Sequence, residues 1–303
     1  MTVMFDVQLL RTFVAVADAR QFTAAGSRLG LSQSTVSQHI RRLETACGRQ
    51  LIARDTHSVT LTPDGAILAD LARSIIALNQ RATDYFSESV PRGRVRLGVS
   101  DDIASTRFSE LLRDLMQRNP TLSVELTIGL TAALYQKLDT GQLDLVFAKR
   151  LPGDDRGEVI WRERLRWIAH HDFALGADDP VPLIMYPTAS ITSALALDAL
   201  NGAGRAWYMA CASETLTGLL AGARAGLGVI AQSRLLIEPL KSDLIEVPAH
   251  ARLPDLGFVE YVVLGRSTKL SGFPASLAAL IMERGAELCW QDAPVSESDL
   301  LST

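Results

Sequence analysis

The sequence predicts a chain with two kinds of domain: an N-terminal winged helix-turn-helix and a C-terminal α/β domain of two lobes. The first prediction rests on residues 22–48, where two short helical patterns meet at a tight turn. The second rests on short apolar segments that alternate with helical patterns after residue 93, as in a parallel sheet. Between them, residues 63–90 repeat apolar side chains every three and four positions, which predicts a long linker helix.

Length and charge narrow the classes of protein. The 303 residues have room for two or three domains, and 48% hydrophobic with 21% charged residues is ordinary globular composition. The net charge of −4 gives no general basic field for nucleic acid. Residues 28–54, however, hold five arginines against one glutamate, a local balance of +4. A compact basic patch on an acidic chain favours sequence-specific DNA binding over general attachment.

The segment after the turn is predicted to be the helix that contacts DNA. Ser32 is expected to cap it, because its hydroxyl accepts a free first-turn N–H. One face is apolar at helical spacing and comprises Val36, Ile40, Leu43 and Cys47. The opposite face carries hydroxyls, amides and arginines but no carboxylate, since Glu44 falls nearer the buried side. Binding in the major groove requires such a face, although a solvated amphipathic helix is the alternative.

The flanking segments support the DNA-binding alternative. Residues 8–19 form an amphipathic pattern that packs behind the helix-turn-helix. After Gly48, the segment LIARDTHSVTLT predicts two short strands around residues 55–58, which is a wing. Arg54 lies near the tip of this wing, within reach of a phosphate or the minor groove.

Residues 8–65 resemble the DNA-binding domain of LysR-type transcriptional regulators, closest in look to the LrhA/HexA-type branch. The matching pieces are LLRTFVAVADA, FTAA, LSQSTVSQHIRRLE and RDTHSVTLTPDG. Two residues depart from the pattern: Gln21 stands where a capping Ser or Asn is usual, and Gly26 costs ~1 kcal/mol relative to Ala inside a helix. With the polar face, the resemblance implies these DNA-binding residues: Thr23, Gln33, Ser34, Ser37, Gln38, Arg41 and Arg54.

The domain boundaries follow from the linker helix. Residues 1–62 form the DNA-binding domain, and the helix starts at Thr62-Pro63-Asp64 and stops before Gly93. About 26 residues span about 39 Å, enough to hold two domains roughly one turn of DNA apart. A heptad seam predicts a dimer, and the alternative is a helix packed on its own domain. The predicted seam comprises Leu68, Leu71, Ile75, Leu78, Ala82 and Tyr85.

The α/β pattern extends over residues 93–290. Lobe I is expected at about 93–160 and 265–290, and lobe II at about 161–264, with segment 260–264 returning to lobe I. The polar tail 291–303 is expected to be disordered. This domain resembles the effector-binding domain of LysR-type regulators, itself similar to periplasmic binding proteins, in the pieces LGVSDDIAS, GQLDLVFAKR and AGARAGLGVIAQ.

Ligands of open α/β lobes bind beyond the carboxyl ends of strands. The residues at such positions, which are predicted to bind an effector, are Ser100, Asp101, Thr131, Ser190 and Ser213. Ser100, Thr131 and Ser213 have helix capping as their alternative role. Asp101 and Asp102 disfavour a strongly anionic effector.

Enzymatic chemistry finds little support in the sequence. There is no G-x-S-x-G elbow and no phosphate-binding glycine loop, so neither catalysis nor a cofactor is expected. His170 and His171 precede Asp172, but neighbours on a strand point to opposite faces, so a solvated pair is expected rather than a metal site. Cys47, Cys211 and Cys289 are too scattered for a disulfide framework, and the first two are expected in cores.

These observations predict an effector-controlled, sequence-specific transcriptional regulator. Its expected partners are promoter or operator double-stranded DNA, a small-molecule effector, further copies of itself from homodimer to homotetramer, and RNA polymerase. No export leader or membrane-spanning run is visible, so a cytoplasmic protein is expected. An α/β enzyme and a solute-binding protein with an accessory helical domain are the alternatives. The effector, the operator and the direction of regulation stay open.

Overall fold

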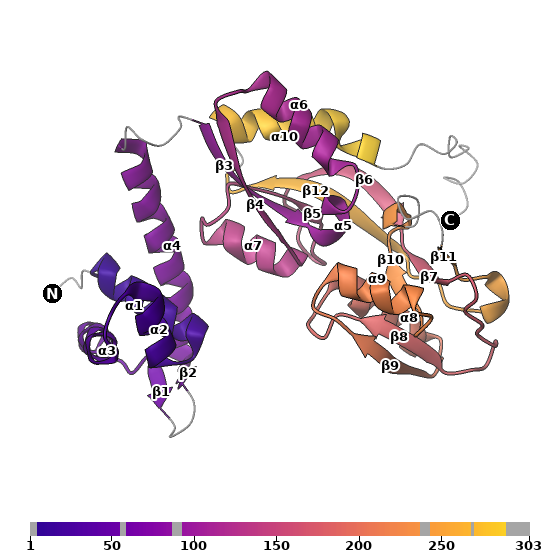
Figure 1. Cartoon of the computed structure of the whole chain (residues 1–303), viewed down its shortest axis with the longest axis horizontal. Coiled ribbons are helices and arrows are strands. Elements are labelled where there is room, and N and C mark those ends of the chain that lie inside the picture. Colours follow the sequence, from indigo (N-terminus) through magenta and orange to yellow (C-terminus); the bar gives the residue numbers. More distant parts are fainter. Residues whose placement is uncertain (1–4, 55–58, 87–92, 237–242, 268–269, 289–303) are drawn as a thin grey trace. The chain divides into compact units, whose positions relative to one another are not determined.

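The computed structural model describes residues 5–54, 59–86, 93–236, 243–267 and 270–288 (Figure 1). Contacts divide the chain into two compact units: residues 1–91 with segment 136–143, and residues 92–135 with 144–303. Within the described residues, no helix combines the length and apolar character that crossing a bilayer requires.

The N-terminal unit has the predicted winged helix-turn-helix. Its elements are α1 (Val7–Ala19), α2 (Phe22–Leu29), α3 (Gln33–Cys47), β1 (Ile52–Arg54), β2 (Val59–Leu61) and α4 (Pro63–Phe86). Strands β1 and β2 pair antiparallel, as expected of a wing. Phe13 and Leu10 of α1 are fully buried against Val36, Ile40 and Leu43 of α3. The apolar stripe of α3 is therefore its inward face, and the opposite face is exposed.

The turn between α2 and α3 depends on two glycines. Gly30 has φ +66°, in the left-handed region, and its N–H bonds to Gly26 O. A Cβ on Gly26 would lie 2.7 Å from Leu31 O, so this glycine permits a close approach of the backbone. Ser32 Oγ then accepts a 3.1 Å hydrogen bond from Thr35 N, which confirms the predicted cap. Gln21 precedes α2 and makes no side-chain cap.

Two side chains fix α3 within this unit. Glu44 Oε1 accepts hydrogen bonds from Leu51 N at 3.0 Å and Ile52 N at 3.3 Å, which attaches the wing to the end of α3. Buried Thr12 donates its hydroxyl to Gln8 O at 3.0 Å. Its oxygen must therefore accept from His39 Nδ1 at 2.9 Å, which places a proton on that nitrogen.

Helix α4 shows that part of the predicted seam is wrong. Leu68 is 7% exposed and packs in the core of the N-terminal unit, and Ile75 is half-buried against the same core. A heptad pattern marks apolar positions but not which stripe faces inward. The exposed apolar side chains are Ile67, Leu71 and Leu78, at 62%, 55% and 53%. Ala82 is exposed too, and the Tyr85 side chain lies outside the described residues.

The first lobe of the α/β domain is a mixed sheet with strand order β4-β3-β5-β12-β6. Its strands are β3 (Gly93–Ser100), β4 (Leu122–Gly129), β5 (Leu145–Lys149), β6 (Glu158–Arg164) and β12 (Phe258–Gly265). β3 is parallel to β4 and β5, while β12 is antiparallel to β5 and β6. Helices α6 (Phe108–Arg118) and α10 (Gly272–Arg284) lie side by side on one face, and α5 (Asp101–Ala104) and α7 (Thr131–Asp139) follow β3 and β4 (Figure 1).

The second lobe contains two small sheets. β8 (Val181–Met185) and β9 (Trp207–Ala212) are parallel, and β10 (Ile230–Gln232) and β11 (Leu244–Glu246) flank β7 (Arg166–His170) antiparallel. Helices α8 (Ile191–Gly202) and α9 (Leu216–Arg224) follow β8 and β9. Short 3-10 turns span Arg234–Leu236 and Ala249–Ala251, and a further one, Gly285–Leu288, follows α10 in lobe I.

Three predictions for the α/β domain can be compared with the structure. The sheet of lobe I is mixed rather than purely parallel, because the returning strand β12 enters it antiparallel. The predicted return of segment 260–264 to lobe I is confirmed by β12, but the lobe II start at residue 161 is wrong, because β6 also belongs to the lobe I sheet. The crossings therefore lie at Leu165 and between β11 and β12. The tail 291–303 lies outside the described residues.

Gly65 offers a test of packing at the start of α4. A Cβ there would lie 2.0 Å from Leu51 O, so Gly65→Ala should force the wing and α4 apart and cost about 1–3 kcal/mol. All four tryptophans follow residue 160. Urea unfolding should therefore show an earlier circular-dichroism transition and an unmoved tryptophan transition. Gly202→Ala, where a Cβ meets nothing within 4 Å, is the control; equal stability of both variants would refute the packing assignment.

Candidate DNA-binding face and ligand cavity

The exposed face of α3 holds most of the predicted DNA-binding residues. Gln33, Ser34, Gln38 and Arg41 are exposed there, and Ser37 is half-buried. Arg41 and its neighbour Arg42 form no ion pair with any described residue. Thr23 is exposed on α2, and Arg54 lies in β1 with its side chain outside the described set. The face therefore presents donors, acceptors and uncompensated cations.

Ser34 has a local partner. Its hydroxyl lies 2.8 Å from Ser32 Oγ, which also accepts the Thr35 N–H. Ser34 thus takes part in the cap of α3 and is exposed at the same time. Such a position, at the first turn of the helix, suits a contact with a phosphate oxygen as well as a cap.

A cavity of about 210 Å³ lies in the α/β domain. It is lined by the carboxyl ends of β3, β4 and β5 in lobe I and by the start of α8 in lobe II. Four of the predicted effector residues line it: Ser100, Asp101, Thr131 and Ser190. The fifth, Ser213, does not. Its Oγ accepts from Thr215 N at 3.2 Å, so Ser213 orders the turn before α9, where Thr215 is the cap.

A buried ion pair forms one wall of the cavity. Lys149 at the end of β5 pairs with Asp102 of α5, at 6% and 3% exposure. The Tyr261 hydroxyl of β12 also donates to Asp102, and the Trp161 ring stacks on Tyr261 at 4.3 Å. Burial opposes ionisation of Asp102, but the Lys149 ammonium and these hydrogen bonds outweigh it and hold its pKa below the usual range.

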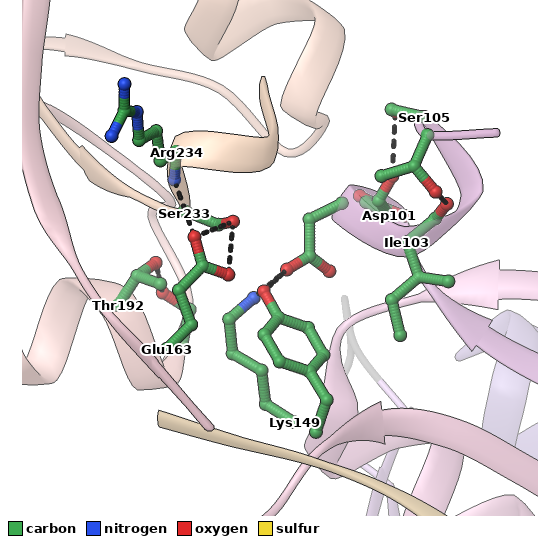
Figure 2. Close-up of polar contacts among 12 residues, drawn as sticks. Asp101, Ile103, Ser105, Lys149, Glu163, Thr192, Ser233 and Arg234 are labelled. Atoms are coloured by element: carbon green, nitrogen blue, oxygen red, sulfur yellow. Dashed lines mark hydrogen bonds and ion pairs between the residues drawn. The ribbon is translucent and has the colours of Figure 1, made fainter. Parts of the chain in front are cut away.

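Glu163 of β6 lies across from Lys149, at the crossing between the lobes (Figure 2). Ser233 Oγ lies 2.8 Å from both Glu163 oxygens, and Arg234 N donates to Oε1 at 2.9 Å. Burial raises the pKa of Glu163, although these two donors partly offset it. The carboxyl group therefore attaches the first crossing strand to the segment after β10.

Sequence patterns missed several residues of the cavity wall. Lys149, Tyr186 and Gln232 come from three separate segments and meet only in the folded domain. Lys149 had a detectable signal: it is a charged residue that closes the otherwise apolar and fully buried strand β5. Charged residues are seldom fully buried unless they are paired.

The histidine pair lies at the end of a strand and in the turn that follows, where His171 is exposed, as predicted for a solvated pair. Strand β7 ends at His170 and His171 lies in the following turn, so the argument from opposite strand faces is wrong. The two rings are 4.2 Å apart, and ligand atoms of His170, His171 and Asp172 lie within 4.8 Å of one another. Asp172 N donates to His170 Nδ1 at 3.2 Å, which occupies that nitrogen. No fourth His, Cys, Asp or Glu joins this group in the described part of the chain.

Cys47 and Cys211, which were both predicted to lie in cores, have partly buried side chains. Cys47 packs against the core of the N-terminal unit, where burial raises the pKa of its thiol, with a smaller contribution from Glu44. Cys211 packs against a cluster of buried apolar side chains in lobe II that includes Ile184, Leu219 and Leu220. Both are half-buried rather than fully enclosed.

Comparison with known proteins places both units in one family. The model of the bacterial regulatory helix-turn-helix protein, lysR family, matches residues 7–66, and that of the LysR substrate binding domain matches residues 88–271. The HTH-type transcriptional regulator PecT of Dickeya dadantii is 34% identical over 82% of this chain and 79% of its own. The HTH-type transcriptional regulator DgdR of Burkholderia cepacia is 32% identical over 83% of this chain and 84% of its own.

Solved structures share the fold. CbnR, a LysR family transcriptional regulator, aligns with a TM-score of 0.62 at 23% identity, over 92% of this chain and 99% of its own. ArgP from Mycobacterium tuberculosis aligns with a TM-score of 0.56 at 22% identity, over 92% and 97%. The named relatives are regulators, which removes the enzyme and solute-binding alternatives. The chain belongs to the LysR family of transcriptional regulators.

Proposed function

We propose that α3 lies in the major groove of operator DNA and that the α/β cavity binds the small molecule that controls this binding. The observation that carries the DNA half is the exposed face of α3, where Arg41 and Arg42 have no ion-pair partner among the described residues. A bidentate arginine or glutamine contact discriminates between bases by about 1–3 kcal/mol. Ser34 and Thr23 supply phosphate contacts that set the register.

The cavity supports the effector half of the proposal. It is enclosed by residues of both lobes, so a ligand there contacts both at once. A ligand shifts an equilibrium between lobe arrangements only through a difference in its affinity for them. Coupling of this kind is typically about 1–3 kcal/mol and is reciprocal, so DNA changes effector affinity by the same factor.

Helix α4 supports self-association. Its exposed Leu71 and Leu78 are seven residues apart, and Ile67 extends the stripe by one turn. Side chains at this spacing lie on one helix face and suit a helix–helix contact with a second copy. We propose that the dimer contact lies here and that two dimers associate into a homotetramer. RNA polymerase is proposed as a further partner at the promoter.

The binding assay begins with selection of genomic fragments by the full-length protein, followed by gel shift on the recovered operator. Arg41→Ala should weaken operator binding by about 10- to 100-fold, because one good base contact is lost. Arg118→Ala removes an equal charge from an exposed site on α6 and should leave affinity nearly unchanged. Operator affinity that falls equally in both variants would show that net charge, rather than the α3 face, determines binding.

Self-association is tested on the exposed stripe of α4. Leu71→Asp with Leu78→Asp should abolish the dimer of DNA-binding units, because unpaired carboxylates become costly in a helix–helix interface. Both side chains are exposed within one chain, so the fold should remain. Analytical ultracentrifugation and footprinting of both half-sites measure the effect, with Asn79→Asp as the charge control on the same helix. Wild-type sedimentation and a complete footprint would place the dimer contact elsewhere.

A further inference from the structure

The negative and positive side chains that line the cavity are unequal in number. Among the described residues, three charged side chains line it: Asp101, Asp102 and Lys149. Lys149 and Asp102 are paired with each other and nearly inaccessible, so their charges cancel locally. Asp101 has no Lys, Arg or His within ion-pair distance among the described residues. Asp101 is therefore the one charged group of the described lining that has no ion-pair partner.

The Asp101 carboxylate lies beside neutral donors and a second carboxylate, and Lys149 acts on it only while paired with Asp102. It begins α5, and its backbone oxygen already accepts the Ser105 Oγ at 2.8 Å (Figure 2). Its side chain is half-buried. Burial, and then the neighbouring Asp102, raise the pKa of Asp101, while the Leu216 N–H, Lys149 and the Tyr186 hydroxyl act in the opposite direction. Burial and the neighbouring Asp102 thus disfavour the charge of this carboxylate, and the neutral donors of lobe II favour it.

An anionic ligand finds little to bind. The ammonium of Lys149 is occupied by Asp102, and neither arginine nor histidine lines the cavity among the described residues. The start of α8 offers about half a positive charge, and the Ser190 hydroxyl already accepts the Ser193 N–H there. A carboxylate ligand would face the full charge of Asp101 against that partial charge.

A cationic ligand finds a matched site. An ammonium group donates three hydrogen bonds, which suits a carboxylate and the hydroxyl oxygens of Thr131 and Thr192. The remaining lining is largely aliphatic and includes Leu130, Leu151 and Ile191. At about 210 Å³ the cavity is below the range of drug-sized ligands. The lining is therefore complementary to a small amine with a short apolar body.

We propose that the cavity selects a small ligand with a cationic amino group, which the Asp101 carboxylate binds directly. This proposal rests on the proposed effector role of the cavity. A charge-assisted hydrogen bond between the ammonium and the carboxylate provides the selectivity, and the aliphatic wall accommodates the rest of the molecule. Contact with Asp101 of lobe I and residues of lobe II also lets the amine bridge the lobes.

The test uses three probes of one size that differ only in their head group: n-butylamine, butyrate and butan-1-ol. Each is titrated against the full-length protein at neutral pH by thermal unfolding and calorimetry. We expect the amine to raise the unfolding midpoint and the other two to leave it unchanged. Asp101→Asn should weaken amine binding by about 10- to 100-fold, because the charge-assisted bond is lost.

Controls separate the proposal from its alternatives. Asp198→Asn removes an equal charge from an exposed site on α8 and should retain wild-type amine binding. Circular dichroism checks that each variant is folded. If Asp101→Asn does not fold, Asp101→Ser replaces it in the same titration. Stabilisation by butyrate, stabilisation by none of the probes, or equal amine binding in folded Asp101 variants overturns the proposal. Operator gel shifts without probe test the proposed function independently, since they do not depend on the ligand.

Discussion

The buried pair of Lys149 and Asp102 is the interaction on which the α/β domain most depends. It joins the end of β5 to α5, and the Tyr261 hydroxyl adds β12, so three separate chain segments meet at one carboxylate. Removing two charges from water costs several kcal/mol per ion, which only their mutual attraction and further hydrogen bonds offset. The same pair neutralises Lys149, which is the one cation that lines the cavity within the described part of the chain, and so leaves Asp101 to set the charge that a ligand meets.

The N-terminal unit was largely predictable, because its signals are local. The Gly30 turn, the Ser32 cap and the inward stripe of α3 each depend on residues within one helix turn of one another. The features that were missed depend on contacts between segments. Gly26 permits the approach of Leu31 O, and Leu68 faces the core because α4 packs against α1. A heptad pattern cannot distinguish such an inward stripe from an outward one.

The cavity was predictable only in part. Strand ends identify positions, and Ser100, Asp101, Thr131 and Ser190 all line the cavity. Ser213 failed because a hydroxyl at a strand end can bond its own turn, as it does with Thr215. Strand β6 was missed because its charged residues mask the alternation, and with it Glu163, whose bonds to Ser233 and Arg234 connect distant segments. Such juxtapositions follow from topology, which single-segment patterns do not contain.

A double-mutant cycle on the buried pair tests this account most directly. Urea unfolding followed by tryptophan fluorescence reports on the α/β domain, which holds Trp161, Trp167 and Trp207 among the described residues. Lys149→Met should cost about 3–5 kcal/mol, because it leaves Asp102 buried without its cation. Lys149→Met combined with Asp102→Leu should recover most of that loss, since neither charge then remains. Additive losses, or a cost below about 1 kcal/mol for Lys149→Met alone, would contradict the central role of this pair.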